Sequence, residues 1–309
     1  MHPETIMNKA PKPRLEEIAE RIYAYIQPDG GWCLSNSGFL VGPDRVTLID
    51  TAATEPRARA LRSAIQSVTS APTRTLINTH HHGDHTYGNG LFPEATIIGH
   101  DDCPAEMIES GLVLTQLWTH VEWGSIDIVP PTVTFPDRLT VYSGKLRMEL
   151  IHVGPAHTTN DVVAWIPEHG VLFAGDVVFS GGTPFTLMGS VSGSLEAIER
   201  LRALGASTVV AGHGPVGGPE LFDATESYLR WIQDLTRQGI EAGLSPLEVA
   251  GETDLGEYQD LLDRERIVGN LHRAYSEARG EANGTKLDDL TIMLEMVTYN
   301  GGQIPTCLA

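Results

Sequence analysis

The hydrophobic pattern of the chain predicts a series of short, buried β-strands. Apolar runs of six or seven residues, rich in Val, Ile and Leu, recur along the first two thirds of the sequence. Runs of this length and composition, bounded by charged or turn-forming residues, indicate strands rather than helices. We expect strands at residues 45–50, 74–79, 95–100, 147–153, 161–166, 170–176 and 207–213.

Segments with helical periodicity alternate with several of these runs. In "SLEAIERLRAL" the apolar positions are Leu195, Ile198, Leu201 and Leu204, a spacing that forms one stripe along a helix. Gly205 follows as a plausible C-terminal cap. Helices are expected at residues 55–67, 194–204, 219–242 and 258–279.

The alternation predicts an α/β fold without an internal linker. We interpret residues 1–309 as a single domain, with a catalytic core at 14–218 and a mainly helical C-terminal extension at 219–309. The residues before the core are expected to form a short flexible lead into a helix or strand. No repeat or low-complexity segment is evident in the sequence.

Polar residues stand at the ends of four predicted strands. Asp50, Asp176 and His213 each close an apolar run just before a loop, and His80 follows the run at 74–79. Ligands of layered α/β proteins gather at strand ends, where loops carry functional groups. Side chains from four distant segments can therefore converge on one point.

The segment "HHHGDH" at residues 80–85 has the chemistry of a metal site. His80 and His82 are two residues apart, so they point the same way in an extended segment. Gly83 allows a turn that directs Asp84 and His85 to a second point nearby. Imidazole and carboxylate ligands suit Zn²⁺, but one tetrahedral zinc cannot use them all and keep an open position. Two metals can, with further candidate ligands at His157, Asp176 and His213.

The ordered set Asp50, "HHHGDH", "GPAHT", "AGD" and "AGHGP" resembles the metallo-β-lactamase superfamily of zinc hydrolases. The resemblance implies an αβ/βα four-layer sandwich: two mixed sheets packed together, helices outside, and metals at one edge. It also implies a role for each matching residue. The first zinc would be bound by His80, His82 and His157, and the second by Asp84, His85 and His213; Asp176 would bridge them, and Asp50 would support the site by hydrogen bonding.

Other features bear on the metals and on the neighbouring histidines. Two Zn²⁺ ions are the expected cofactors, although iron or manganese is compatible with these ligands. His81 alternates with the ligands, so it is expected to point away from the metals.

Cys33, Cys103 and Cys307 are far apart and form no CxxC pair, which indicates neither a disulfide framework nor a cysteine zinc site.

Composition excludes some partners. The net charge of −19 argues against nucleic acid, because a polyanion requires a basic surface. The same charge disfavours anionic membranes, and no run approaches the roughly 18 apolar residues of a membrane span. With no signal-like apolar segment near its start, the chain is expected to be a soluble cytoplasmic protein.

The expected chemistry is attack of activated water on a carbonyl. Two zinc ions would lower the pKa of water and polarise an ester, thioester, lactone or amide, while Asp84 could move a proton. With an aspartate at position 176, the chain resembles the glyoxalase II, lactonase and thioesterase members of the superfamily, whereas true β-lactamases usually carry Cys or Ser there. Antibiotic hydrolysis is therefore not expected. Glyoxalase II needs basic residues to hold the carboxylates of glutathione, and the sequence after His213 shows no clear set of such residues.

Three apolar segments are expected to form the substrate pocket. Aromatic and Met side chains beside a polar metal centre suit a large, partly planar organic substrate, although ordinary packing is the alternative for each of them. The candidate pocket residues are Trp32, Asn36, Trp118, His120, Trp123, Phe185 and Met188.

A second resemblance concerns the stretch "GGTPFTLMGSVSGSLEAIERLRALGA" and the later "ERIVGNLHRAYSE". Both are similar to metallo-β-lactamase-fold cyclase/thioesterases of bacterial aromatic polyketide pathways, such as second-ring cyclases of the actinorhodin type. This implies a polyketide bound to an acyl carrier protein, closed by an aldol reaction or released by thioester hydrolysis. Carrier proteins are acidic, as this chain is; the arginines that could dock one are Arg264, Arg266, Arg273 and Arg279.

Two alternatives remain open. The first is a generic hydrolase, such as a lactonase or a small acyl-thioester hydrolase. The second is a metal-binding protein that has lost catalysis, which the seven intact ligand positions disfavour.

Overall fold

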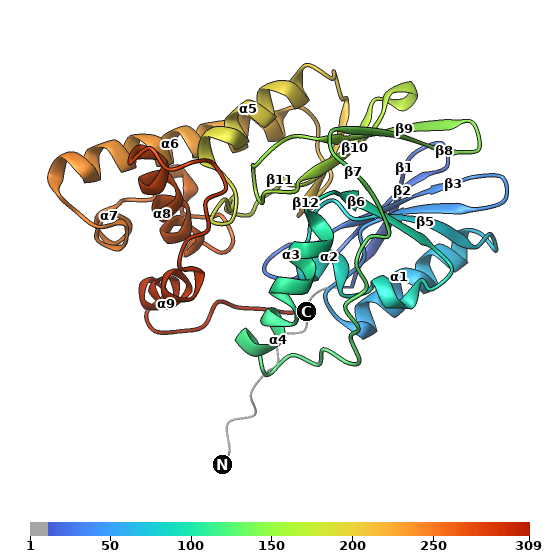
Figure 1. Ribbon diagram of the computed structural model, residues 1–309, viewed down its shortest axis with the longest axis horizontal. Coiled ribbons are helices and arrows are strands. Elements are labelled where there is room, and N and C mark those ends of the chain that lie inside the picture. The colour runs from blue at the N-terminus through green and yellow to red at the C-terminus, as the bar shows by residue number, and fades with distance from the viewer. Residues whose placement is uncertain (1–11) are drawn as a thin grey trace, which may run out of the picture.

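The computed structural model describes residues 12–309, and the expected N-terminal lead lies largely outside the described residues. Two sheets face each other, and helices cover their outer sides (Figure 1). The first sheet has the strand order β1-β2-β3-β4-β5-β6-β7 and mixes antiparallel with parallel pairs. Its strands are β1 (Arg14–Ala19), β2 (Ile22–Ile26), β3 (Ser37–Val41), β4 (Val46–Ile49), β5 (Thr73–Ile77), β6 (Thr96–His100) and β7 (Val133–Phe135).

The second sheet has the order β12-β11-β10-β9-β8 and is also mixed, because only β11 and β12 run parallel. Its strands are β8 (Arg138–Ser143), β9 (Leu146–His152), β10 (Val162–Ile166), β11 (Val171–Phe179) and β12 (Thr208–His213). The register between β11 and β12 shifts around Gly175, whose φ is +52°. A residue without a Cβ tolerates this backbone, and the irregularity lies directly before Asp176.

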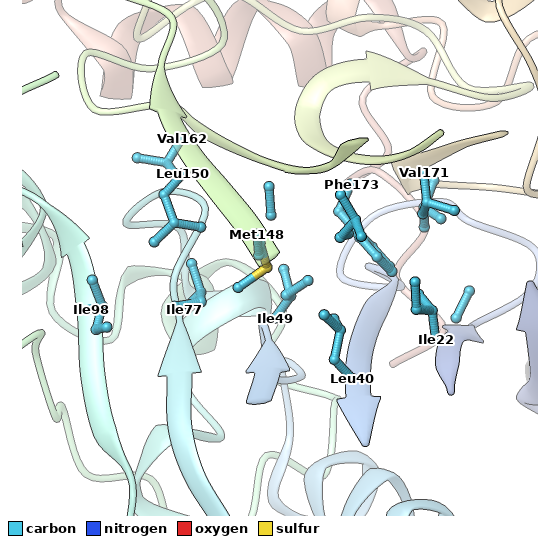
Figure 2. Packing of buried hydrophobic residues seen from close by; sticks show 14 of the residues in the cluster. Ile22, Leu40, Ile49, Ile77, Ile98, Met148, Leu150, Val162, Val171 and Phe173 are labelled. Carbon is cyan, nitrogen blue, oxygen red and sulfur yellow. The ribbon is translucent and has the colours of Figure 1, made fainter. Parts of the chain in front are cut away.

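The main core lies between the two sheets (Figure 2). Leu40 and Ile49 approach it from the first sheet, and Leu150 and Phe173 approach it from the second. Full burial of such a side chain stabilises the fold by roughly 1.5–3 kcal/mol. Gly38 of β3 leaves room for the Phe173 ring, because a Cβ at that position would overlap the ring.

Helices on the outer faces complete four layers. Leu61 and Ile65 of α1 (Glu55–Val68) pack against the first sheet, and Ile198 and Leu201 of α5 (Val191–Arg202) pack against the second. The αβ/βα sandwich expected from the sequence is therefore confirmed. Three short helices follow β5 and β6: α2 (Gly83–Thr86), α3 (Cys103–Ser110) and α4 (Val113–Leu117); the 3₁₀ turns are η1 (Asn89–Leu91), η2 (Pro167–His169) and η3 (Gly256–Tyr258).

The C-terminal part is helical, as expected, but one predicted helix begins later than expected. Its helices are α6 (Glu220–Ala242), α7 (Pro246–Glu252), α8 (Arg266–Ala278) and α9 (Asp289–Tyr299). The helix expected at 258–279 begins only at Arg266, because Leu262 pairs with Gly182 and Asp263 adopts a left-handed backbone, φ +57°. Helices α6 to α9 share an apolar cluster with Phe179 and Leu187, so the extension packs directly on the segment that follows the bridging candidate. Among the described residues, no helix is long and apolar enough to cross a membrane.

Candidate metal centre

All seven predicted ligands lie at one edge of the sandwich. Asp50 follows β4, residues 80–85 follow β5, and His157 lies in the loop between β9 and β10. Asp176 lies within β11 just after its bulge, and His213 ends β12. Their ligand atoms form three groups, each within 4.8 Å. Two have no residue in common: the first group is His80, His82 and His157, and the second group is Asp84, His85 and His213. A third, His80, His85 and Asp176, joins the other two.

In the first group, the histidine rings each turn one nitrogen toward a common point. His157 Nε2 lies 2.9 Å from His82 Nδ1, and the opposite nitrogen of each ring is occupied. His157 Nδ1 lies 2.5 Å from the Phe185 carbonyl oxygen, to which it donates. His82 Nε2 lies 3.1 Å from the sulfur of Met188. These contacts fix the tautomers so that the facing nitrogens carry lone pairs, which is the state that binds metal.

The second group is oriented in the same way. His85 Nδ1 donates to Asp50 Oδ2 at 2.8 Å, and His213 Nδ1 donates to the carbonyl oxygen of Gly30 at 3.0 Å. His213 Nε2 then lies 3.3 Å from Asp84 Oδ2. A buried carboxylate that holds a ligand imidazole is a common support of metal sites, and Asp50 occupies that position.

Asp176 lies between the two groups. Its Oδ1 is 3.1 Å from His85 Nε2, and its Oδ2 is 3.3 Å from His213 Nε2 and 3.4 Å from His157 Nε2. Gly212 allows this approach, since a Cβ there would overlap Asp176 Oδ1 and lie 2.8 Å from the Asp176 backbone nitrogen. The carboxylate can therefore contact both groups at once.

Several inward-facing atoms have no hydrogen-bond partner among the described residues. His80 Nε2, His85 Nε2 and Asp176 Oδ1 are all buried, and none of them makes a hydrogen bond of acceptable geometry, although His85 Nε2 and Asp176 Oδ1 lie 3.1 Å apart. Buried polar atoms are otherwise satisfied in the great majority of cases, so a cluster of three orphans demands a ligand. Two imidazole nitrogens and a carboxylate oxygen are metal donors, and the residues present therefore fit metal ions.

Electrostatics differ between the two groups. Burial lowers the pKa of His80, His82 and His157, so these rings are neutral at pH 7. Burial opposes protonation of His213 as well, but Asp176 and Asp84 outweigh it and raise its pKa to about 9. The pKa of His85 is also raised, again against burial, by the surrounding carboxylates. In the second group, protons therefore compete with metal for the imidazoles.

His81 does not belong to these groups, as its alternation predicted. Its ring is buried, and Asn160 Nδ2 lies 2.9 Å from His81 Nδ1. Burial lowers the pKa of His81 to about 3. The same loop contains Asp161, a residue that sequence reasoning missed. It accepts hydrogen bonds from the Thr158 amide at 2.9 Å and the Thr158 hydroxyl at 2.7 Å, which fixes the loop that carries His157.

A cavity of about 530 Å³ opens onto the metal centre. Ligand residues His82, Asp84, His157, Asp176 and His213 form its floor. Its walls come from α3 and α4 on one side and from α8 and the segment around α9 on the other (Figure 1). Four of the predicted pocket residues line it, namely Trp32, Trp118, Phe185 and Met188.

The profile of the family described as "Metallo-beta-lactamase superfamily" matches residues 30–213, which is more than half of the chain. The chain belongs to this superfamily. The match spans the metal-binding motifs, strands β3 to β7 of the first sheet and the whole of the second sheet. Members of the superfamily are hydrolases that usually bind zinc, so the chain is assigned to a hydrolase superfamily.

Individual relatives are distant. The chain is 23% identical over 225 residues to metallo-beta-lactamase type 2 of Bacteroides fragilis, covering 69% of this chain and 83% of that protein. It is 30% identical over 170 residues to the hydroxyacylglutathione hydrolase of Rhodospirillum rubrum, covering 54% of this chain and 56% of that hydrolase. The DIM-1 metallo-beta-lactamase structure superposes with a TM-score of 0.59 at 21% identity, over 72% of this chain and 99% of that one, which shows a shared fold.

Three of the predicted pocket residues do not line the cavity. Asn36 is buried beneath the metal centre, where its Nδ2 donates to the carbonyl oxygens of Ala211 and Gly214. Trp123 packs beside Tyr87 and donates from Nε1 to the Trp118 carbonyl oxygen. His120 is exposed on the turn after α4. The prediction was wrong for His120 and Trp123 because the chain turns away from the cavity after Trp118. It was wrong for Asn36 because its amide holds the backbone on either side of His213.

The expected arginine docking patch is also wrong. Arg266 and Arg273 are buried, so they cannot form a surface with the exposed Arg264 and Arg279. The Arg266 guanidinium stacks over the Trp32 ring, 4.1 Å from its centroid, and Arg273 donates to the Leu187 carbonyl oxygen. These two cations join the extension to the cavity wall.

Proposed function

We propose that the chain is a dinuclear zinc hydrolase that acts on the thioester, or a related carbonyl, of a bulky aromatic acyl group. In its most specific form, the substrate is an aromatic polyketide bound to an acyl carrier protein, which undergoes aldol ring closure, thioester hydrolysis or both. The observation that carries the proposal is the largely apolar cavity that ends on the metal-ligand cluster.

Two metals are proposed because two of the ligand groups have no residue in common, and the carboxylate of Asp176 lies within 3.4 Å of ring nitrogens from both. His80, His82 and His157 would hold one ion, and Asp84, His85 and His213 would hold the other. When bound, the metals supply Lewis acidity, which lowers the pKa of water and polarises a carbonyl oxygen. Asp84 is a partly accessible carboxylate, 12% exposed, on the cavity floor, where it can accept a proton from water and return it to the leaving group.

The shape and chemistry of the cavity favour a large acyl group. Its volume falls within the range of about 300–1,000 Å³ that is usual for organic ligands. Trp32, Phe185 and Met188 offer flat or polarizable surfaces close to the ligand residues. At the edge, Val113 and Leu290 are 43% and 70% exposed, so the apolar surface continues outward and would receive a substrate that extends beyond the cavity.

A thioester is proposed over an amide or a lactone for two reasons. The relative from Rhodospirillum rubrum is named for hydroxyacylglutathione, which is a thioester. In addition, residues 181–206 and 265–277 carry the resemblance to aromatic polyketide cyclase/thioesterases, and these segments contribute Phe185, Met188, Arg266 and Arg273 to the cavity. A lactonase or small acyl-thioester hydrolase is the alternative; the apolar volume above the ligands would then be largely unused.

The metal part of the proposal is tested by metal analysis of the purified chain. We expect close to two equivalents of zinc, and a sharp loss in His82→Ala and Asp176→Ala. His120→Ala is the matched control, because this imidazole is exposed and lies outside the cluster. One equivalent that is unchanged by Asp176→Ala would exclude the bridging role.

The substrate part is tested by comparing acyl groups at constant metal content. Aromatic acyl thioesters of N-acetylcysteamine and a carrier-protein-bound aromatic polyketide are compared with acetyl thioesters and homoserine lactones. We expect the highest kcat/KM for the aromatic thioesters, and free acid or a changed ring pattern from the carrier-bound substrate. Rapid turnover of simple lactones, without action on the carrier-bound intermediate, would favour the alternative.

A further inference from the structure

Two cysteines from opposite ends of the chain meet beside the metal centre. Trp32 and Cys307 form an isolated parallel β-bridge, which brings Cys307 next to Cys33. Both side chains belong to the same buried cluster, with 2% and 5% of their surface exposed, and each thiol shifts the pKa of the other through a hydrogen bond. The sequence had offered no reason to pair them, because their separation carries no spacing signal.

The segment that carries Cys307 is held on both sides. Trp118 Nε1 donates to the Pro305 carbonyl oxygen at 2.7 Å, and an Arg57 guanidinium nitrogen donates to the Leu308 carbonyl oxygen at 2.7 Å. These bonds reach α1 and the end of α4, so the position of Cys307 is fixed by contacts with the core. Cys33 is fixed as well, in a left-handed backbone with φ +64°.

We propose that Cys33 and Cys307 form a reversible disulfide that ties the segment 305–309 to the wall of the substrate cavity. A disulfide requires Cα atoms roughly 4.4–6.8 Å apart, and Cys33 directly follows Trp32, the residue that bridges to Cys307. Cys33 and Trp32 both line the cavity, so the bond would fix the loop that forms one of its walls. This proposal is independent of the substrate and of the metal content.

The reaction balances with a small disulfide, such as oxidised glutathione, as the oxidant. One protein thiolate attacks the small disulfide and releases one thiol; the other protein thiolate then attacks the mixed disulfide and releases the second. Both cysteine sulfurs are oxidised, the small disulfide is reduced to two thiols, and the two protons of the protein thiols pass to these released thiols. Cys307 is the favoured first nucleophile, because a hydrogen bond from Cys33 lowers its pKa, whereas burial raises the pKa of Cys33.

Cavities lie on both sides of the thiol pair. Thr306 and Leu308, which flank Cys307, line a second cavity of about 1200 Å³ that also borders Trp32. The backbone on both sides of Cys307 therefore borders this second cavity, whereas Cys33 lines the substrate cavity. Cys103 has no such role, because it is buried beneath β6 and its thiol contacts neither of the other two.

The test uses the metal-loaded chain incubated with oxidised glutathione, blocked with an alkylating agent and digested with trypsin without reduction. We expect a linked pair of peptides 22–45 and 287–309 that separates on reduction. Backbone amides of 303–309 should then exchange hydrogen more slowly than in the reduced chain. The linked peptide should persist in Cys103→Ser and be absent in Cys307→Ser, while all variants retain the circular dichroism of the folded chain.

The unfolded chain supplies the decisive comparison. In denaturant, loop-closure entropy favours the cysteines that are closer in sequence, so Cys33 should pair mainly with Cys103. A linkage of Cys33 to Cys307 that dominates only in the folded chain supports the proposal. Folded protein that remains fully reduced, or that carries only glutathione adducts, under conditions that oxidise the unfolded chain would overturn it.

Discussion

Asp50 accepts a hydrogen bond from His85 Nδ1 at 2.8 Å, and this contact connects the end of β4 to the metal centre. The same carboxylate accepts two more hydrogen bonds, from the Thr79 amide at 2.8 Å and the Thr79 hydroxyl at 2.7 Å. Asp50 adopts a left-handed backbone, φ +56°, which aspartate tolerates better than most residues. One buried side chain thus fixes both the start of the histidine segment and the orientation of a ligand.

Asp50→Asn should weaken metal binding without removing a ligand. The amide NH₂ cannot accept a hydrogen bond, so either His85 or Thr79 loses its partner. We expect affinity for the proposed second metal to fall about 10- to 100-fold and the metal-free chain to lose about 1–3 kcal/mol of unfolding free energy. Chelator competition and urea unfolding measure the two effects.

The control for this variant is Asp44→Asn, an exposed carboxylate paired only with Arg45. Asp44→Asn should change neither the metal affinity nor the unfolding free energy measurably, because exposed ion pairs contribute little to stability. An Asp50→Asn variant with unchanged metal affinity would show that the hydrogen bond to His85 does not support the site.

Gly212→Ala should disrupt the centre by crowding rather than by changing a ligand. The new Cβ would overlap Asp176 Oδ1 and lie 2.7 Å from the Gly175 carbonyl carbon, and the backbone neighbour cannot give way easily. We expect a loss of about 1–3 kcal/mol in unfolding free energy, together with a fall in bound metal. Gly251→Ala in α7 is the matched control, since no atom lies within 4 Å of its new Cβ. Full metal content in Gly212→Ala would contradict the inferred close approach of residue 212 to Asp176.

The metal ligands could be predicted from the sequence because each motif is local. The spacing of residues 80–85 defines four ligands within one segment, and strand ends mark Asp50 and His213. The bulge at Gly175 was not predicted: β11 continues to Phe179, and Asp176 reaches the centre from within the strand rather than from its end. A register shift depends on the neighbouring strand, which a single run of residues does not reveal.

The cavity and the thiol pair depend on tertiary packing, so the sequence defined them less well. Trp118 and Trp123 are similar in the sequence, yet only Trp118 lines the cavity, because the chain turns between them. Arg273 looked like a surface charge on a helix, but the extension folds back and buries it against Leu187. Contacts of this kind join segments whose separation along the chain carries no pattern.

The metal-free chain should be most stable near pH 6.5. His213 has a folded pKa of about 9, raised from 6.5, so its contribution is fully present below pH 6.5 and is lost as the pH rises through about 9. His80 and His82 have lowered pKa values, so the unfolded chain takes up protons that the folded chain does not as the pH falls below 6.5. The free energy of unfolding therefore decreases both above and below pH 6.5.

Urea unfolding of chelator-treated protein between pH 5 and pH 9 measures this curve. His213→Asn should reduce the alkaline decrease and leave the acidic one, because the first histidine group is unchanged. Stability that rises steadily from pH 6.5 to pH 9 in the metal-free wild-type chain would contradict the assignment of proton binding to the second group.

Phe185→Leu should separate substrate binding from metal binding. The ring lines the cavity, while the hydrogen bond to His157 comes from the backbone carbonyl and survives the substitution. Losing part of an aromatic contact surface costs about 1 kcal/mol, so KM for aromatic acyl thioesters should rise several-fold. KM for an acetyl thioester, kcat and zinc content should remain within twofold of the wild-type values.

Tyr142→Ala is the control for this variant, because the Tyr142 ring is 61% exposed on β8, outside the cavity. Equal losses for aromatic and acetyl substrates would show that Phe185 supports the metal centre rather than the acyl group.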